Sequence, residues 1–130
     1  MDKELYDKGM AIRREVLGDA YVDRALAKSG PFNDPLQELV TTYCWGWCWG
    51  RDELPKRDRS LINLAMIAIL NRKDELKAHI RGALTNGLTK AEISEVLLQT
   101  AIYGGVPCAV DSFRAANEAF AEIEAAKAAE

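Results

Sequence analysis

Residues 55–70 read PKRDRSLINLAMIAIL, and this stretch decides the fold class. Pro55 suits the first turn of a helix, because proline fixes φ near the helical value and its missing N–H needs no partner there. From Leu61 to Leu70 apolar side chains cover nearly every face of that helix, a pattern typical of a helix buried on all sides. We therefore predict a central, fully buried helix that begins at Pro55.

Helix signals continue on the carboxyl side of this stretch. Asn71 is expected to cap a helix that ends at Gly87, and residues 89–92, TKAE, form a capping box for the next helix. Pro107 then opens a last helix. No segment alternates apolar and polar residues as a strand would. We predict an all-α fold of about six or seven helices in a single domain, residues 1–130.

On the amino side we expect two shorter helices, over about residues 3–16 and 19–28. A third should follow Asp34 as N-cap, with Pro35 in its first turn. Its apolar residues recur at the spacing of an amphipathic α-helix, and we expect this stripe to face the core: Leu36, Leu39, Val40, Tyr43, Cys44 and Trp47.

Two features predict a homo-oligomer. Trp45 and Trp49 fall outside the stripe just described, and residues 55–70 are too apolar for a helix in a two-layer monomer. Burial of a second helix face between subunits would explain both. The alternative is that the two amino-terminal helices cover these faces within the monomer.

The composition excludes several classes of protein. Hydrophobic residues make up 48% and charged residues 28% of the 130 residues, which is typical of one globular domain. The net charge of −3 argues against nucleic-acid binding, and no apolar run of about 18 residues predicts a membrane span. The first ten residues lack the apolar core of a signal peptide, and three cysteines fit a reducing compartment. We therefore expect a cytoplasmic location and no nucleic-acid or membrane partner.

His79 is the only histidine of the chain, so a metal site with several histidines is impossible within one chain, and we expect no metal. On a helix it follows Glu75 by four residues and lies at the border of an apolar stripe. Glu75 could then orient one ring nitrogen while the other reaches a pocket. The alternative is a partly buried structural histidine that is satisfied by a backbone carbonyl.

Residues 45–51, WGWCWGR, combine aromatic side chains with a cation. Trp45 and Trp49 could form an apolar wall, and Arg51 a bidentate clamp for a small organic carboxylate. The alternative is packing by the tryptophans, with Arg51 paired to Asp52 or Glu53.

Six sequence blocks follow one another without long gaps between about residues 34 and 113: 45–51 (WGWCWGR), 59–66 (RSLINLAM), 75–79 (ELKAH), 81–89 (RGALTNGLT), 92–99 (EISEVLLQ) and 103–109 (YGGVPCA). Together they resemble the 4-carboxymuconolactone decarboxylase family. The resemblance implies an alkylhydroperoxidase-D-like helical fold and a homohexamer. It also implies a cofactor-free lyase that converts a lactone dicarboxylate, 4-carboxymuconolactone, into β-ketoadipate enol-lactone and CO2 in protocatechuate catabolism.

That reaction needs a bound carboxylate, a poorly solvated place for the leaving carboxylate, stabilisation of an oxyanion and one proton. The expected catalytic residues are His79 and Glu75. The expected substrate-binding residues are Arg51, Trp45, Trp49 and Tyr103.

Peroxidases of the same superfamily carry a CxxC motif whose second cysteine precedes the histidine by four residues. Those two positions are Arg72 and Glu75 here, and Ser60 stands where the peroxidases carry a glutamate, so the redox branch is disfavoured. We expect the cysteines to be small buried hydrophobes: Cys44, Cys48 and Cys108. Two alternatives stay open: action on another lactone or a hydroperoxide, and a non-catalytic helical oligomer.

Overall fold

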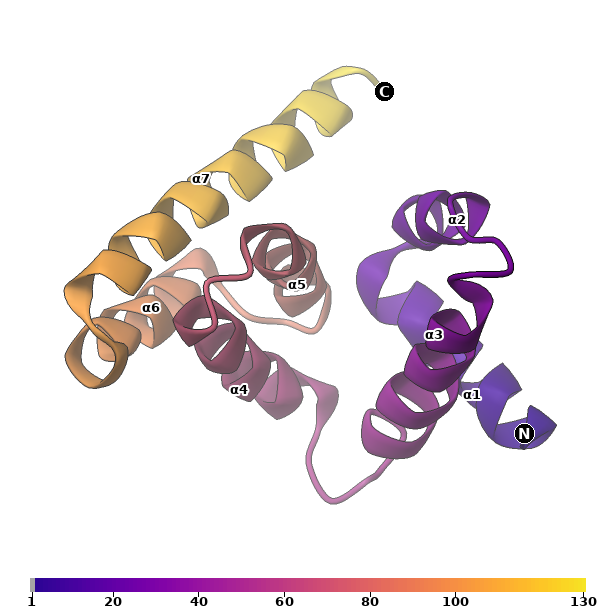
Figure 1. Ribbon diagram of the computed structural model, residues 1–130. Helices are drawn as coiled ribbons and strands as arrows, with labels where there is room; N and C mark the ends of the chain where they lie inside the picture. The colour runs from indigo at the N-terminus through magenta and orange to yellow at the C-terminus, as the bar shows by residue number, and fades with distance from the viewer. Residues whose placement is uncertain (1) are drawn as a thin grey trace. The chain divides into compact units, whose positions relative to one another are not determined.

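The computed structural model describes residues 2–130, which form seven α-helices and one π-helix and contain no strand (Figure 1). The all-α prediction is therefore confirmed. The chain divides into two compact units, Met1–Lys56 and Arg57–Glu130, while the single domain stays a prediction. None of the helices in the described part of the chain is long and apolar enough to cross a membrane.

The first unit contains α1 (Lys3–Leu17), α2 (Asp19–Ala27), α3 (Asp34–Leu39) and the π-helix η1 (Val40–Cys48). The two amino-terminal helices match the prediction. The expected N-cap of the third helix is wrong by one residue, since Asn33 occupies that position and Asp34 is the first helical residue. Asp34 instead accepts a hydrogen bond from the Ser29 hydroxyl at 2.7 Å.

The π-helix overturns the predicted apolar stripe. Its hydrogen bonds span five residues, as in the bond from the Trp49 N–H to the Cys44 carbonyl at 2.9 Å, so its turn is wider than an α-turn. The wider turn brings a different set of side chains inward: Thr41, Thr42, Trp45 and Gly46 are buried. Tyr43 and Trp47, the stripe members predicted to be buried there, are 50% and 55% exposed. Leu36 and Leu39 of the predicted stripe lie before the π-helix, in α3, and are each 55% exposed as well.

The core of the first unit lies between α1 and η1. Trp45 and Trp49 stack with ring centroids 4.9 Å apart, and they pack with Ile12 and Val16 of α1. Because both indoles are at most 5% exposed, they are core residues of this unit.

Arg13 ties α1 to the segment that leads into the π-helix. Its guanidinium is buried and donates to the Gln37 side-chain oxygen at 2.8 Å and to the Thr41 hydroxyl at 3.2 Å. Burial lowers the pKa of Arg13 below its usual value. These polar contacts satisfy part of a buried charge that the sequence pattern did not reveal.

The second unit contains α4 (Lys56–Ile69), α5 (Lys73–Thr85), α6 (Lys90–Gly104) and α7 (Val106–Ala128). In Figure 1 the long helix α7 runs past α5 and α6, and it packs on both. Side chains of all four helices form one core, in which the large members are Leu64, Leu76, Ile80, Ile93 and Leu97.

The prediction of a fully buried helix at residues 55–70 is wrong. In α4 only Ser60, Leu64 and Ala68 are buried, while Ile62 and Met66 are about half exposed. Leu64 and Ala68 of α4 join the core that the other three helices of this unit share, whereas other apolar side chains of α4 are exposed.

Asn71 ends α4 and does not cap α5, contrary to the prediction. Its φ of 58° is left-handed, and its N–H donates to the Ala68 carbonyl at 3.1 Å while the Arg72 N–H donates to the Ile67 carbonyl at 3.3 Å. This pair of bonds is a Schellman motif, in which asparagine tolerates the left-handed position. Arg72 occupies the N-cap of α5 without a side-chain hydrogen bond.

The other two expected helix ends are confirmed. Gly87 has a φ of 99° and follows the end of α5, and the Leu88 N–H donates to the Ala83 carbonyl at 2.9 Å. The Thr89 hydroxyl accepts from the Glu92 N–H at 3.1 Å, and the Glu92 carboxylate accepts from the Thr89 N–H at 3.0 Å. This reciprocal pair is the predicted capping box.

Candidate active site

His79 lies on α5 between buried Ala78 and Ile80 and is itself partly buried. The side-chain amide nitrogen of Asn63, on α4, is 3.2 Å from His79 Nδ1. An amide nitrogen only donates, so Nδ1 is the acceptor and the proton of the neutral ring is on Nε2. The site therefore presents an imidazole of defined tautomer.

Burial also sets the charge of this ring. It lowers the pKa of His79 from 6.5 to about 4, because the imidazolium is poorly solvated there. The ring is therefore neutral at pH 7. A neutral imidazole is a weak acid, but its N–H is a good hydrogen-bond donor to a developing oxyanion.

Because the pKa of His79 is lower in the folded protein than in the unfolded chain, acidic pH should destabilise the fold. Between pH 6.5 and about 4 the unfolded chain binds a proton on His79 and the folded chain does not, so the free energy of unfolding falls as the pH drops through this window. We expect the free energy of unfolding, measured with urea, to decrease between pH 7 and pH 4.5 in both proteins. The decrease should be about 2 to 3 kcal/mol larger in the wild type than in His79→Gln. Equal losses in the two proteins would contradict this prediction.

The other expected site residues of the second unit are exposed. Glu75 lies on the exposed side of α5, one turn before His79. Tyr103, near the end of α6, is 83% exposed and lines an apolar groove between α4 and α6, of about 390 Å3, with Ile62 and Ile69 among its walls. The roles of Glu75 and Tyr103 stay predictions.

The expected site residues of the first unit are Trp45, Trp49 and Arg51. The two tryptophans contribute to its core, as described above. Arg51 is exposed, and its guanidinium carbon lies 5.2 Å from the ring centroid of Trp47. This cation–π contact involves the one tryptophan of the cluster that is exposed. Substrate binding by these three residues stays a prediction.

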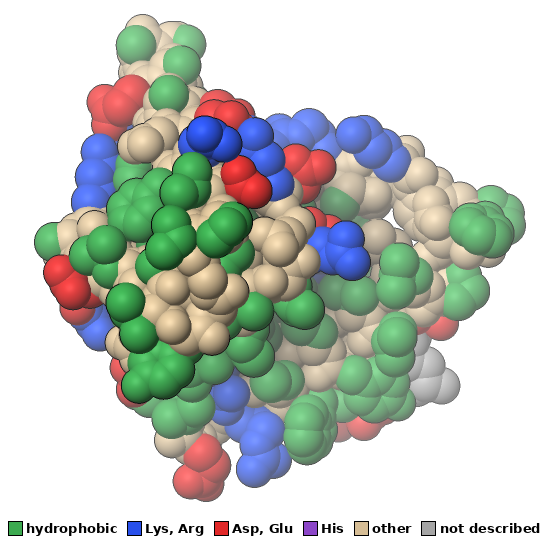
Figure 2. Space-filling view, turned by 60° about the vertical axis from the view of Figure 1, so that its left-hand side comes forward, with side chains coloured by type: hydrophobic (Ala, Val, Ile, Leu, Met, Phe, Trp, Pro, Cys, Tyr) green, Lys and Arg blue, Asp and Glu red, His purple; other side chains and the backbone are tan. Residues whose placement is uncertain are grey.

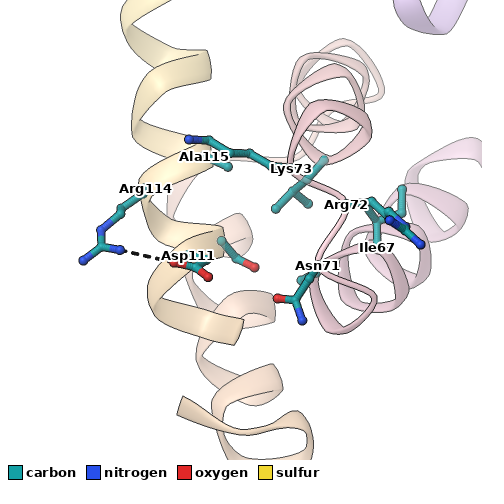
Figure 3. A pocket seen from close by; sticks show the side chains of 10 residues that line it. Ile67, Asn71, Arg72, Lys73, Asp111, Arg114 and Ala115 are labelled. Carbon is teal, nitrogen blue, oxygen red and sulfur yellow. Dashed lines mark hydrogen bonds and ion pairs between the residues drawn. The ribbon is translucent and has the colours of Figure 1, made fainter. Parts of the chain in front are cut away.

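A polar cavity of about 270 Å3 lies in the second unit between α7 and the junction of α4 with α5 (Figure 3). Two of its cations are paired with acids: Arg114 with Asp111 at 3.2 Å and Lys73 with Glu118 at 2.9 Å. Figure 3 shows Arg114 extending away from the cavity. A third cation, Arg72, also lines the cavity, so its positive charge is only partly balanced by these two pairs.

The cysteines differ in exposure. Cys108 is buried, Cys48 is partly buried and Cys44 is exposed, so the expectation of burial is wrong for Cys44. Cys44 lies in the π-helix, whose longer period does not keep the α-helical stripe on the core side. No group of three histidine, cysteine or acidic side chains within residues 2–130 is placed to hold a metal ion.

Sequence reasoning did not single out Asn63, which contacts His79, although it lies within the block RSLINLAM. The available signal was a polar residue among apolar ones on α4. Arg59, partly buried, precedes Asn63 by one helical turn and shares its side of α4. Arg59 is therefore a second cation to consider for a substrate carboxylate.

Comparisons with known proteins agree with this architecture. The sequence profile of the carboxymuconolactone decarboxylase family matches residues 34–118. A 4-carboxymuconolactone decarboxylase of Acinetobacter baylyi is 36% identical over 122 residues, which cover 94% of this chain and 91% of that protein. A nitrosuccinic acid decarboxylase of Metarhizium robertsii is 40% identical over 112 residues, 86% of this chain and 78% of that protein.

Proposed function

Because the chain belongs to the carboxymuconolactone decarboxylase family, we propose that it is a cofactor-free decarboxylase whose substrate is 4-carboxymuconolactone. The observation that supports this reaction best is the neutral His79, held at Nδ1 by Asn63 at 3.2 Å. Decarboxylation of such a lactone generates an oxyanion, and a fixed neutral donor stabilises an oxyanion without first giving up its own proton.

The lactone carries its own electron sink. The bond between the ring carbon and the departing carboxylate breaks, and its electron pair passes through the ring C=C bond to the lactone carbonyl oxygen. A furan-like oxyanion and CO2 result. A proton then adds to the carbon α to the carbonyl and gives the enol-lactone.

In this scheme His79 Nε2–H donates a hydrogen bond to the oxyanion. Full proton transfer from a neutral imidazole would leave an imidazolate, which is costly, so the proton on carbon comes from water or from another acid of the site. Arg51 remains the sequence-based candidate for binding the carboxylate that is not lost. Trp45 and Trp49 are at most 5% exposed in the core of the first unit, so exclusion of water from the leaving group by these rings stays a prediction.

The match to a nitrosuccinic acid decarboxylase supports a second candidate substrate, nitrosuccinate. Here the departing carboxylate is on the carbon that bears the nitro group, whose oxygens take the electron pair as a nitronate. A proton then adds to that carbon. Both substrates thus carry a second carboxylate and place negative charge on oxygen, which is the charge that a neutral histidine stabilises.

The test is a direct assay of the purified protein with each substrate in turn. CO2 release is the common measurement, and loss of ultraviolet absorbance follows the lactone independently. We expect kcat/KM for 4-carboxymuconolactone to exceed that for nitrosuccinate. The reverse order would assign the second substrate, and release of CO2 from neither would refute the proposal.

Replacement of Arg51 separates binding from chemistry. If Arg51 holds the retained carboxylate in both ground and transition states, Arg51→Ala should raise KM about 10- to 100-fold and change kcat little. Arg51→Lys should restore only part of the loss, because an ammonium does not form the bidentate pair. A normal KM in Arg51→Ala, with a raised KM in Arg59→Ala, would assign the carboxylate to Arg59.

We also propose a homohexamer, and a cytoplasmic location remains part of this proposal. The exposed apolar side chains of the second unit support self-association: Ile62, Met66, Ile69, Leu98, Ile102, Tyr103 and Val106. Figure 2, which brings the side of α6 and α7 forward, shows hydrophobic side chains gathered over much of that face. Sedimentation velocity should give a hexamer at micromolar concentration, and a stable monomer would contradict this.

A further inference from the structure

We propose that Asn63 is a positioning residue that selects the catalytic tautomer of His79. Its amide nitrogen donates to Nδ1 over 3.2 Å, so the amide stabilises the ring only when Nδ1 lacks a proton. This inference rests on the proposed function, because it assigns the remaining Nε2–H to the oxyanion of the decarboxylation.

The placement of the pair supports this role. Asn63 and His79 come from α4 and α5 and are both partly buried in the second unit. A free imidazole interconverts between its two neutral tautomers in water. A partly buried donor aimed at Nδ1 removes that freedom before substrate binds, so the ring does not have to reorganise during the reaction.

The Asn63 amide is uncharged, which also matters for the tautomer of His79. A carboxylate in place of Asn63 would accept a hydrogen bond from Nδ1–H and would stabilise a proton at that nitrogen. Asparagine offers a donor without a negative charge, which keeps Nδ1 unprotonated. Asp and Asn are nearly the same size, so Asn63→Asp reverses the polarity of this contact and changes the volume little.

The same two helices provide a matched control. Asn86, which follows the last residue of α5, donates through its side-chain amide to the Ser60 hydroxyl at 2.9 Å. Ser60 lies on α4, three residues before Asn63, and is buried. Ser60→Ala therefore removes a hydrogen bond between α4 and the end of α5 and leaves the side chains of Asn63 and His79 unaltered.

The experiment is nitrogen-15 NMR of the imidazole, in protein labelled with nitrogen-15 histidine. The chain has one histidine, so the two ring nitrogens are assigned without ambiguity. In the wild type at pH 7 we expect Nδ1 to give the signal of an unprotonated nitrogen and Nε2 that of a protonated one. The same pattern should persist in Ser60→Ala.

In Asn63→Asp we expect Nδ1 to carry a proton and kcat to fall at least about 10-fold, with a smaller change in KM. Asn63→Ala, which introduces no charge, should show a mixture of the two tautomers and an intermediate kcat. It keeps the proposal testable if Asn63→Asp does not fold.

Three results would overturn the proposal. They are a protonated Nδ1 in the wild type, an unchanged tautomer in a folded Asn63 variant, and a normal kcat in a variant whose tautomer has changed. Because the NMR pattern is read without substrate, it can hold even if neither candidate substrate is decarboxylated. Failure of the proposed function can therefore be distinguished from failure of the proposal that Asn63 positions His79.

Discussion

His79→Ala is expected to lower kcat by about 100-fold or more and to leave KM nearly unchanged. In the proposed mechanism the ring supplies a donor to charge that develops only in the transition state, whereas other residues bind the substrate carboxylates. Burial holds the pKa of His79 at about 4, so the wild-type ring stays neutral and this donor is present throughout the neutral range. Steady-state kinetics of the purified variant, with either candidate substrate, provide the measurement.

Circular dichroism and sedimentation of the same sample show whether the loss is catalytic or structural. His79→Gln is the second variant, because a glutamine amide can still donate a hydrogen bond and should retain part of the activity. Near-normal turnover in folded His79→Ala would make His79 a structural residue. The oxyanion would then need another donor, for which Tyr103 is the candidate.

The helix ends show where sequence reasoning succeeds. Thr89 and Glu92, three residues apart, exchange hydrogen bonds between side chain and backbone N–H. At Gly87 the backbone hydrogen bonds that end α5 span only a few residues. Such signals are complete within the local sequence. Asn71 was misassigned because asparagine suits both an N-cap and a left-handed C-terminal position, and only the φ of 58° distinguishes them.

The segment Val40–Cys48 shows where a correct helical assignment still gives the wrong face. The apolar residues fit the α period, so they predicted a buried stripe that includes Tyr43 and Trp47. A π-helix has a longer period, and it buries Thr41 and Trp45 in their place. The wide turn is stabilised by packing on α1, a contact between segments far apart in the chain.

The central residue of the candidate active site could be chosen from the sequence, but its contacts could not. His79 stood out as the only histidine, and Glu75 was its natural partner on one helix face. The structure instead brings Asn63, 16 residues away and on another helix, to the ring. Which face of α4 meets α5 depends on how the two helices pack, and periodicity does not encode that.

The largest expected effect on stability comes from Gly9→Ala. In α1 the backbone of Gly9 lies directly against η1, so an added methyl group would lie 1.9 Å from the Thr41 carbonyl oxygen and 2.7 Å from the Gly46 nitrogen. Both neighbours are backbone atoms of a packed helix and cannot rotate away. Alanine normally stabilises a helix interior relative to glycine by about 1 kcal/mol, but here we expect a loss of at least about 3 kcal/mol from overpacking.

Tryptophan fluorescence during urea unfolding measures this loss in the first unit, since all three tryptophans are at positions 45, 47 and 49. Gly30→Ala is the matched control, because a methyl group at Gly30 meets nothing within 4 Å, and it should leave the unfolding midpoint nearly unchanged. Gly46→Ala should resemble Gly9→Ala, because its methyl group would lie 2.4 Å from the Leu5 carbonyl oxygen. If Gly9→Ala unfolds at the wild-type urea concentration, α1 and η1 are not in backbone contact, and the burial of Trp45 and Trp49 needs another explanation.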